Sequence, residues 1–171
     1  NIISQFKIKS LSKSASIFSY KKLDFFNNYF LRLDSNTKLF EEFCKSNKIL
    51  REYFALDKEK LIKVFNVYKK DISKYIEIIN IAAIYFSKNF RKYSDEKFQD
   101  DFNNIYIKFL ELIININKWE YDIINLEIKE FIKKNNIKFP VLGKPVRYLL
   151  TNNYNGPSIT DIFMILGKTE S

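Results

Sequence analysis

Residues 98–132 read FQDDFNNIYIKFLELIININKWEYDIINLEIKEFI, and this stretch decides the fold. Large apolar side chains recur in it every three or four positions, which is the spacing of one face of an α-helix. The first stripe, entered at Ser94, comprises Phe98, Phe102, Ile105, Phe109, Leu112 and Ile116. The second comprises Trp119, Ile123, Ile124, Ile128, Phe131 and Ile132. Asn117 and Glu120 have capping-box spacing before the second stripe. The stretch therefore predicts two consecutive amphipathic helices.

The rest of the chain before residue 140 carries the same pattern. Residues 1–139 contain no glycine or proline, so long helices joined by short polar turns are expected. Ser19 and Asp57 are candidate N-caps in front of two of the stripes. These stripes, predicted to face the core, are Leu23, Phe26, Phe30 and Leu31; Leu61, Val64, Phe65 and Tyr68; and Ile72, Ile76 and Ile79. The sequence thus predicts an all-α fold.

The last 32 residues hold every glycine and proline of the chain. The residue before Pro140 should be extended, because the helical region is disfavoured there. Pro145 and Pro157 each suit the first position of a short helix, and Gly167 suits the position just past the end of the last one. The tail is therefore predicted to form two short helices separated by an exposed loop, Thr151–Gly156.

Composition excludes several classes of function. The 171 residues, 46% of them hydrophobic, suffice for one substantial core or two small ones. No run approaches the ~20 apolar residues that a membrane span needs. The chain has no histidine, so histidine-based catalysis and histidine-ligated metal sites are excluded. Its single cysteine, Cys44, cannot form an internal disulfide, which indicates a reduced, intracellular protein. Because the chain starts at Asn1 and its single methionine is Met164, we expect a piece of a longer protein.

The net charge of +9 is concentrated at the two ends. Residues 1–33 carry six Lys and Arg against one Asp, and residues 134–171 carry five against one Asp and one Glu. The middle of the chain is nearly neutral, with 18 basic and 17 acidic residues over 34–133. Such ends suit a polyanion that lies across more than one part of the surface. Charge alone equally fits two ordinary solvated ends.

Two motifs at opposite ends point to a family. Residues 10–14, SLSKS, resemble only weakly the KMSKS loop of class I aminoacyl-tRNA synthetases, and the partner His-x-Gly-His motif cannot exist in a chain without histidine. The stretch SKSASIFSYKKLDFFNNYFLR (12–32) resembles the KSPAxFDxxKLxxLNxxYIR pattern of bacterial glutamyl-tRNA synthetases. The tail, with KPVRYLLT (144–151), GPSI (156–159) and ILGK (165–168), resembles the ending of the same family.

The resemblance implies the noncatalytic, C-terminal part of a glutamate–tRNA ligase. Residues 1–33 would form a stem-contact segment, followed by an all-helical anticodon-binding cage of two subdomains, 34–93 and 94–171. No catalytic residue, metal or cofactor is expected on this piece; ATP with magnesium would be used by the parent enzyme. The expected partner is the tRNA for glutamate. A cytoplasmic monomer that binds neither membrane nor DNA is expected.

The resemblance also implies specific RNA contacts. Arg147 matches a family residue that contacts the anticodon, and its planar fork can both stack on a base and donate paired hydrogen bonds. Gly156, Pro157 and Ile159 match family residues at the start of the last helix that pack against anticodon bases. The basic first segment, which would lie against the tRNA body, contributes Lys13, Lys21 and Lys22.

One departure from the family affects specificity. Many members carry an arginine that reads the third anticodon base; here Lys70 takes its place if Ser73 stands for the following threonine, and a gapless alignment gives Asp71 instead. Neither is arginine, so an enzyme that charges both glutamate and glutamine tRNAs is an open alternative. A helical protein–protein interaction module without RNA binding is the alternative of a different class. A membrane-surface protein is disfavoured, because the long apolar stripes need one another as packing partners.

Overall fold

The computed structural model describes residues 17–33, 37–87 and 100–171, and within these residues the regular structure is helical throughout. The elements are α2 (Tyr20–Leu33), α3 (Lys38–Ser46), α4 (Lys48–Leu56), α5 (Lys58–Tyr68), the 3-10 turn η2 (Tyr75–Glu77), α6 (Ile78–Phe86), α7 (Asp100–Asn115), α8 (Tyr121–Lys134), α9 (Phe139–Thr151) and α10 (Ile159–Leu166). The all-α prediction is confirmed. Ser94, Phe98 and the boundary expected between residues 93 and 94 lie outside the described residues.

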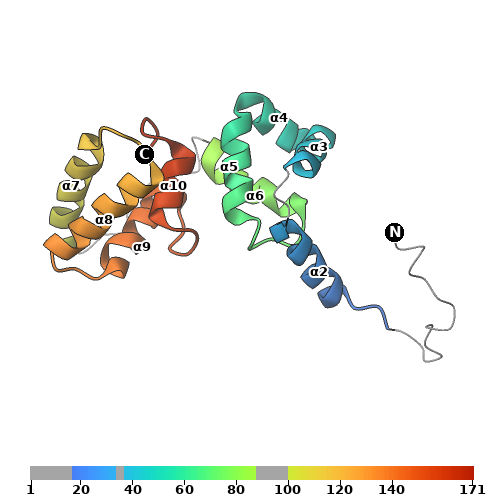
Figure 1. The fold of residues 1–171 in the computed structure, drawn as a ribbon, viewed down its shortest axis with the longest axis horizontal. Coiled ribbons are helices and arrows are strands. Elements are labelled where there is room, and N and C mark those ends of the chain that lie inside the picture. Colours follow the sequence, from blue (N-terminus) through green and yellow to red (C-terminus); the bar gives the residue numbers. More distant parts are fainter. Residues whose placement is uncertain (1–16, 34–36, 88–99) are drawn as a thin grey trace.

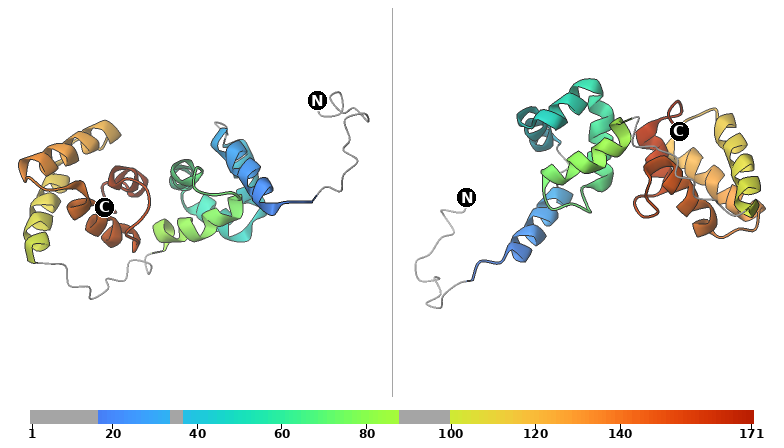
Figure 2. Two further views of the ribbon diagram at one scale, coloured as in Figure 1. Left: turned by 90° about the horizontal axis from the view of Figure 1, so that it is seen from below. Right: turned by 180° about the vertical axis from the view of Figure 1, so that it is seen from behind.

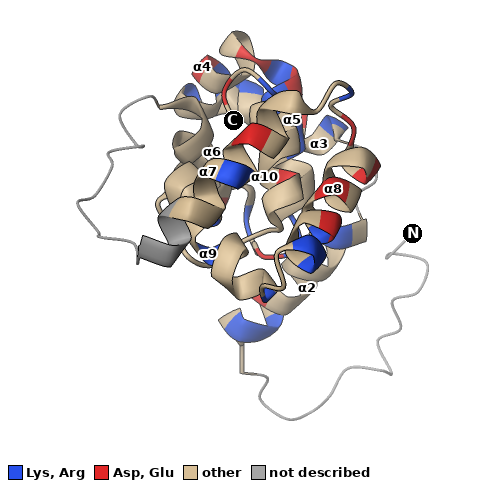
Figure 3. Ribbon diagram, turned by 90° about the vertical axis from the view of Figure 1, so that its left-hand side faces the viewer, with Lys and Arg blue, Asp and Glu red and all other residues tan. Residues whose placement is uncertain are grey.

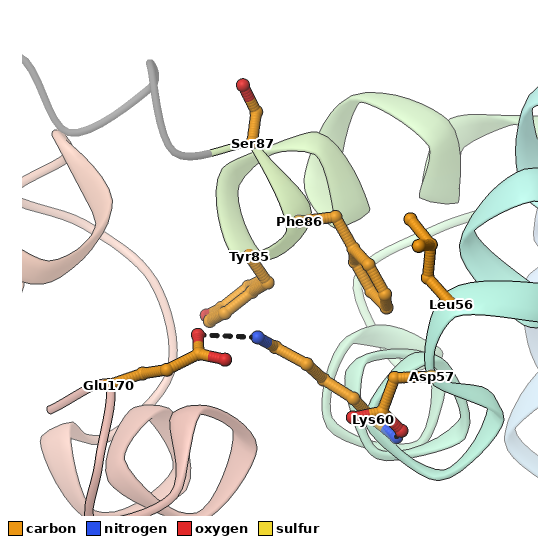
Figure 4. A pocket seen from close by; sticks show the side chains of 7 residues that line it. All are labelled: Leu56, Asp57, Lys60, Tyr85, Phe86, Ser87 and Glu170. Atoms are coloured by element: carbon orange, nitrogen blue, oxygen red, sulfur yellow. Dashed lines mark hydrogen bonds and ion pairs between the residues drawn. The ribbon is translucent and has the colours of Figure 1, made fainter.

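The helices form two groups that lie side by side, α2–α6 and α7–α10 (Figures 1 and 2). The groups meet where α10 packs on α5. An ion pair reinforces this junction: Lys60 of α5, which is buried, donates from Nζ to Glu170 at 2.6 Å and lies over the Phe86 ring (Figure 4). These contacts fix the relative position of the two groups.

The first group is built around α5 as its sequence predicts, except that Ile76, which the third stripe placed in the core, is 47% exposed. Asp57 caps this helix by accepting from the backbone N–H of Lys60 at 2.9 Å. Leu61, Val64 and Phe65 are buried, and Phe65 stacks on Phe40 of α3 with ring centroids 4.1 Å apart. Burial raises the pKa of the nearby Cys44 thiol to about 12, with the charge of Glu41 adding to the shift. Cys44 is therefore a core residue with little thiolate character.

The apolar stripe of α2 is an exception to the predicted core. Ser19 does accept from the backbone N–H of Lys22, as expected of an N-cap. Of the stripe, however, Leu31 is buried while Leu23, Phe26 and Phe30 are exposed, so the core assignment of these three was wrong. Helical spacing shows that side chains share a face, but it does not show which face meets the protein.

The second group corrects the expected start of α8. This helix begins at Tyr121 with Glu120 in the N-cap position, three residues after the predicted cap Asn117. Trp119 lies before the helix, where its indole N–H donates to the carbonyl of Phe163 at 3.3 Å. That tertiary contact with α10 outweighs the local capping signal.

The prolines also sit differently from the prediction. Phe139 is helical rather than extended, because Pro140 falls in the first turn, where its missing N–H is not needed. Pro145 lies inside α9 instead of starting a helix; burial of Leu142 and Val146 on one face outweighs the lost hydrogen bond. Pro157 precedes the N-cap of α10 rather than occupying its first position.

The predicted place of Gly167 just past the last helix is confirmed, whereas Thr151, expected to begin the exposed loop, is buried and is the last residue of α9. Asn152 ends α9 in the left-handed conformation, with φ 53° and ψ 29°, and Gly167 follows α10 with φ 73°. Among the described residues, no helix is long and apolar enough to cross a membrane.

Candidate nucleic-acid interface

The loop between α9 and α10 is the exposed feature that the sequence predicted. Residues 152–156 are all exposed, while Thr151 before them and Pro157 after them are buried. Gly156 has φ +141°, a backbone conformation that side chains with a Cβ rarely adopt. The loop is thus anchored at both ends and presents its middle to solvent.

Arg147 holds this loop in shape. Its Nε donates to the carbonyl of Pro157 at 2.9 Å, and its Nη1 donates to the carbonyl of Tyr154 at 2.9 Å. The backbone carbonyl of Arg147 accepts from the Thr151 hydroxyl at 2.8 Å. Two of the five guanidinium N–H donors therefore bind the loop backbone, and the half-buried side chain lies beside it.

Further contacts stabilise the two sides of the loop. Tyr148 of α9 stacks on Tyr154 with ring centroids 4.5 Å apart and planes within 15°. Ser158 accepts from the backbone N–H of Asp161 at 3.0 Å, and its hydroxyl donates to the Asp161 carboxylate at 2.6 Å. Ile159 is only 1% exposed, so its side chain packs in the core beneath the loop. Pro157 and Ile159 consequently shape this surface from below.

A second turn, residues 69–72 after α5, faces the loop from the first group. Lys70 and Asp71 are exposed on it, whereas Ile72 is buried and anchors it. The carbonyl of Lys70 accepts from two side chains of α2, Asn28 at 3.1 Å and Arg32 at 2.9 Å. We call residues 69–72 the α5 turn and residues 152–156 the α9 loop.

A cavity of about 440 Å³ lies between the α5 turn and the α9 loop. Both groups of helices contribute to its wall, with Tyr68, Asp71, Ile81 and Ile84 from the first and Thr151, Asn153, Asn155 and Gly156 from the second. Its volume falls in the range of roughly 300–1,000 Å³ that is typical of small-ligand pockets. The lining combines apolar side chains with hydrogen-bonding groups.

Tyr68, the last residue of α5, lines this cavity. Its hydroxyl lies 2.8 Å from the hydroxyl of Tyr85, and a Cβ on Gly156 would lie 4.0 Å from it. Burial raises the pKa of Tyr68; the charges of Asp71 and Asp161 add to the shift, while the bond to Tyr85 and the charge of Arg147 oppose it. The phenol therefore stays protonated at neutral pH and is available for hydrogen bonding.

The basic residues are spread over the surface. Lys21 and Lys22 are exposed on α2, away from the cavity lining, and Lys13 lies outside the described residues. Figure 3 shows Lys and Arg on both groups of helices with Asp and Glu interspersed. Of the residues predicted to bind RNA, the structure thus places Gly156 at the cavity, Arg147 behind the loop, and Lys70 on the turn opposite.

Several residues of this site carried no signal in the sequence. Tyr68 reads as one more apolar residue of the α5 stripe, and Ile81 and Ile84 belong to an apolar run. Asn153 and Asn155 are loop residues whose clustering between α9 and α10 was a weak hint. Asn28 and Arg32 contact a turn about 40 residues away, a pairing that no local pattern reveals.

Comparisons with known proteins agree with this picture. A family model described as an anticodon binding domain matches residues 37–171. The chain is 27% identical, over 98% of its length, to a glutamate–tRNA ligase of Pelagibacter ubique, and 32% identical, over 96%, to glutamate–tRNA ligase 1 of Aliarcobacter butzleri. It spans only 37% and 35% of these two relatives.

Solved structures give the same fold. A glutamate-tRNA synthetase of Elizabethkingia anophelis superposes with a TM-score of 0.68 at 21% identity, and a glutamate tRNA ligase of Elizabethkingia meningosepticum with 0.71 at 21%. Both cover 96% of this chain, which in turn covers 32% and 33% of them.

Proposed function

The chain belongs to the family of anticodon-binding domains, and we propose that it recognises the anticodon loop of a tRNA at the cavity between the α5 turn and the α9 loop. Unpaired anticodon bases can be splayed out of their stack and hydrogen-bonded at their Watson–Crick edges. The cavity offers apolar walls for the face of a base and polar side chains for its edge. This combination at an exposed junction is the observation that carries the proposal.

Similarity to glutamate–tRNA ligases supports a tRNA for glutamate as the partner. In this proposal the chain is the tRNA-recognition part of such a ligase. The chain matches only 37% of the length of the Pelagibacter relative. ATP, with magnesium, is used by the part of the enzyme outside this match. The match to an anticodon-binding family favours RNA over a protein as the ligand. We further propose a cytoplasmic setting, a single copy of the chain per tRNA, and no binding of DNA or membranes.

The candidate contacts have different roles in this proposal. Arg147 acts mainly on the α9 loop, which its guanidinium holds in an open shape, and presents its remaining donors beside that loop. Gly156 lets the backbone pass close to the base, because it has no Cβ. Pro157 and Ile159 support the loop from the core. Lys70 or Asp71 contacts the base from the opposite wall, so acceptance of a glutamine tRNA depends on this turn.

The lysines of the first segment serve a separate purpose. Lys21 and Lys22 are exposed on α2, and we assign them, with Lys13, to the phosphates of the tRNA body. Contacts of this kind raise affinity without reading sequence. They also make binding weaken steeply as salt is added, because each phosphate contact releases counterions.

A binding titration tests the proposal. The labelled anticodon stem–loop of a glutamate tRNA should bind the full chain, and the affinity should fall with salt. Arg147→Ala should weaken binding by about 1–3 kcal/mol, because the α9 loop is no longer held in place against the bound base. The matched control is Arg51→Ala, which removes an exposed arginine of α4 and should leave the isotherm unchanged. An Arg147→Ala isotherm identical to wild type would remove this site assignment.

A further inference from the structure

We propose that Asn28 and Arg32 of α2 are positioning residues that set the α5 turn, and through it one wall of the proposed base-binding cavity. The α2 segment otherwise belongs to the part of the chain expected to contact the tRNA body. The expected effect on RNA binding rests on the proposed function. The effect of Asn28 and Arg32 on the α5 turn can be measured without RNA.

The contacts between α2 and the α5 turn are polar and specific. The Asn28 amide nitrogen donates to two carbonyls of the turn, that of Lys70 at 3.1 Å and that of Ile72 at 2.5 Å. Arg32 Nη2 donates to the same Lys70 carbonyl at 2.9 Å. Two donors from successive turns of one helix thus converge on a short piece of backbone, and this fixes its position and orientation.

An ion pair extends this contact beyond the turn. Asp24, one helical turn before Asn28, lies 3.3 Å from Lys74 Nζ. Asp24, Asn28 and Arg32 are spaced four residues apart and therefore lie on one face of α2. This polar face meets the body of the protein, while Phe26, about half a turn round the helix from Asn28, is exposed. The helix is thus held by polar contacts as well as by Leu31, which is buried in the core.

The turn that α2 holds also forms the cavity wall. Asp71 lines the cavity, and it directly follows Lys70, whose carbonyl Asn28 and Arg32 bind. Asn28 also binds the carbonyl of Ile72, and the buried side chain of Ile72 anchors the turn in the core. A change in the position of α2 must therefore move Asp71 relative to the α9 loop. Binding of the tRNA body to α2 and binding of an anticodon base in the cavity are then coupled. Such coupling is reciprocal, so each event changes the affinity of the other by the same factor.

The first arm of the test is hydrogen exchange of the full chain without RNA. Asn28→Ala removes the donor to both carbonyls, and the backbone amides of Asp71 and Ser73 should then exchange faster than in wild type. Phe26→Ala is the matched control, because it shortens an exposed side chain of the same helix that lies about half a turn round the helix from Asn28. Unchanged exchange in both Asn28→Ala and Arg32→Gln would overturn the positioning role.

The second arm is a double-mutant cycle on binding of the anticodon stem–loop. Asn28→Ala should weaken binding about 3- to 10-fold in the wild-type background and hardly at all in the Asp71→Ala background. A purely structural loss would instead weaken both backgrounds equally, and that additive result would overturn the inference. If the wild-type chain fails to bind the hairpin, the proposed function is wrong, and the exchange arm still decides the positioning role.

Discussion

The α9 loop and the α5 turn are both held by an arginine that donates to backbone carbonyls, but the two arginines come from different distances along the chain. Arg147 binds carbonyls seven and ten residues ahead of it, within its own helix–loop–helix unit. Arg32 of α2 binds a carbonyl 38 residues ahead, in the turn that follows a different helix, α5. The first wall is therefore shaped locally, whereas the second depends on how a separate helix docks. Changes in α2 should alter only the second wall.

The largest expected effect comes from breaking the local wall at its backbone. Gly156→Val places a branched side chain at φ +141° and should destabilise the folded chain by about 1–3 kcal/mol. Urea denaturation measures this loss. Asn152→Gly is the control, because Asn152 is also left-handed but glycine adopts that conformation freely. Equal stability of Gly156→Val and wild type would show that the loop is not constrained at this position.

A smaller effect is expected at the cap that ends the α9 loop. Ser158→Ala removes the hydroxyl that accepts from the backbone N–H of Asp161, so we expect a loss of about 1 kcal/mol in unfolding free energy. Ser158→Thr keeps the hydroxyl and should retain most of it. A Ser158→Ala variant as stable as wild type would contradict the assignment of this residue as the N-cap.

The structure also shows which parts of the fold local sequence can predict. Asp57, Ser19 and Gly167 act within a few residues of themselves, and each adopts the predicted role. Asn117 fails as a cap, because Trp119 is held outside α8 by a carbonyl of α10, 44 residues away.

The same division runs through the candidate site. The exposed α9 loop beside Arg147 was predictable from the glycine, prolines and asparagines around it. The opposite wall was not, because Asn28 and Arg32 reach it across about 40 residues and an amphipathic pattern says nothing about polar docking. Phe26 and Phe30 of α2 are exposed because that helix contacts the protein through its polar residues and, of the predicted stripe, through Leu31.

The junction between the two groups offers a modest test that leaves both walls intact. Glu170→Gln removes the charge that pairs with Lys60 at 2.6 Å. Because the Glu170 side chain is 49% exposed, screening by solvent limits the expected loss to about 0.5–1 kcal/mol. The loss should shrink at high salt in thermal unfolding experiments. Glu127→Gln, in α8, provides a control for removing one acidic side chain elsewhere.

The smallest effect concerns the phenol that lies between the walls. Because the folded-state pKa of Tyr68 is raised, its contribution to stability is present below the ordinary pKa of about 10 and is lost as the pH rises through the folded value. Tyr68→Phe has no ionisable hydroxyl, so the share of the fall in unfolding free energy at high pH that comes from Tyr68 should disappear. The measurement compares the fall in unfolding free energy between pH 8 and pH 11 in the two proteins; identical falls would argue against a perturbed Tyr68.

Binding of anticodon stem–loops with one abasic site tests the central claim most directly. Each loop nucleotide is replaced in turn by an abasic residue, and binding to the wild-type chain and to Ile84→Trp, which fills the cavity, is measured. We predict that one position loses about 1–3 kcal/mol with the wild-type chain, because stacking and edge contacts in the cavity disappear, and that this loss vanishes with Ile84→Trp. If every abasic hairpin binds the wild-type chain as tightly as the intact one, no base enters the cavity between the α5 turn and the α9 loop.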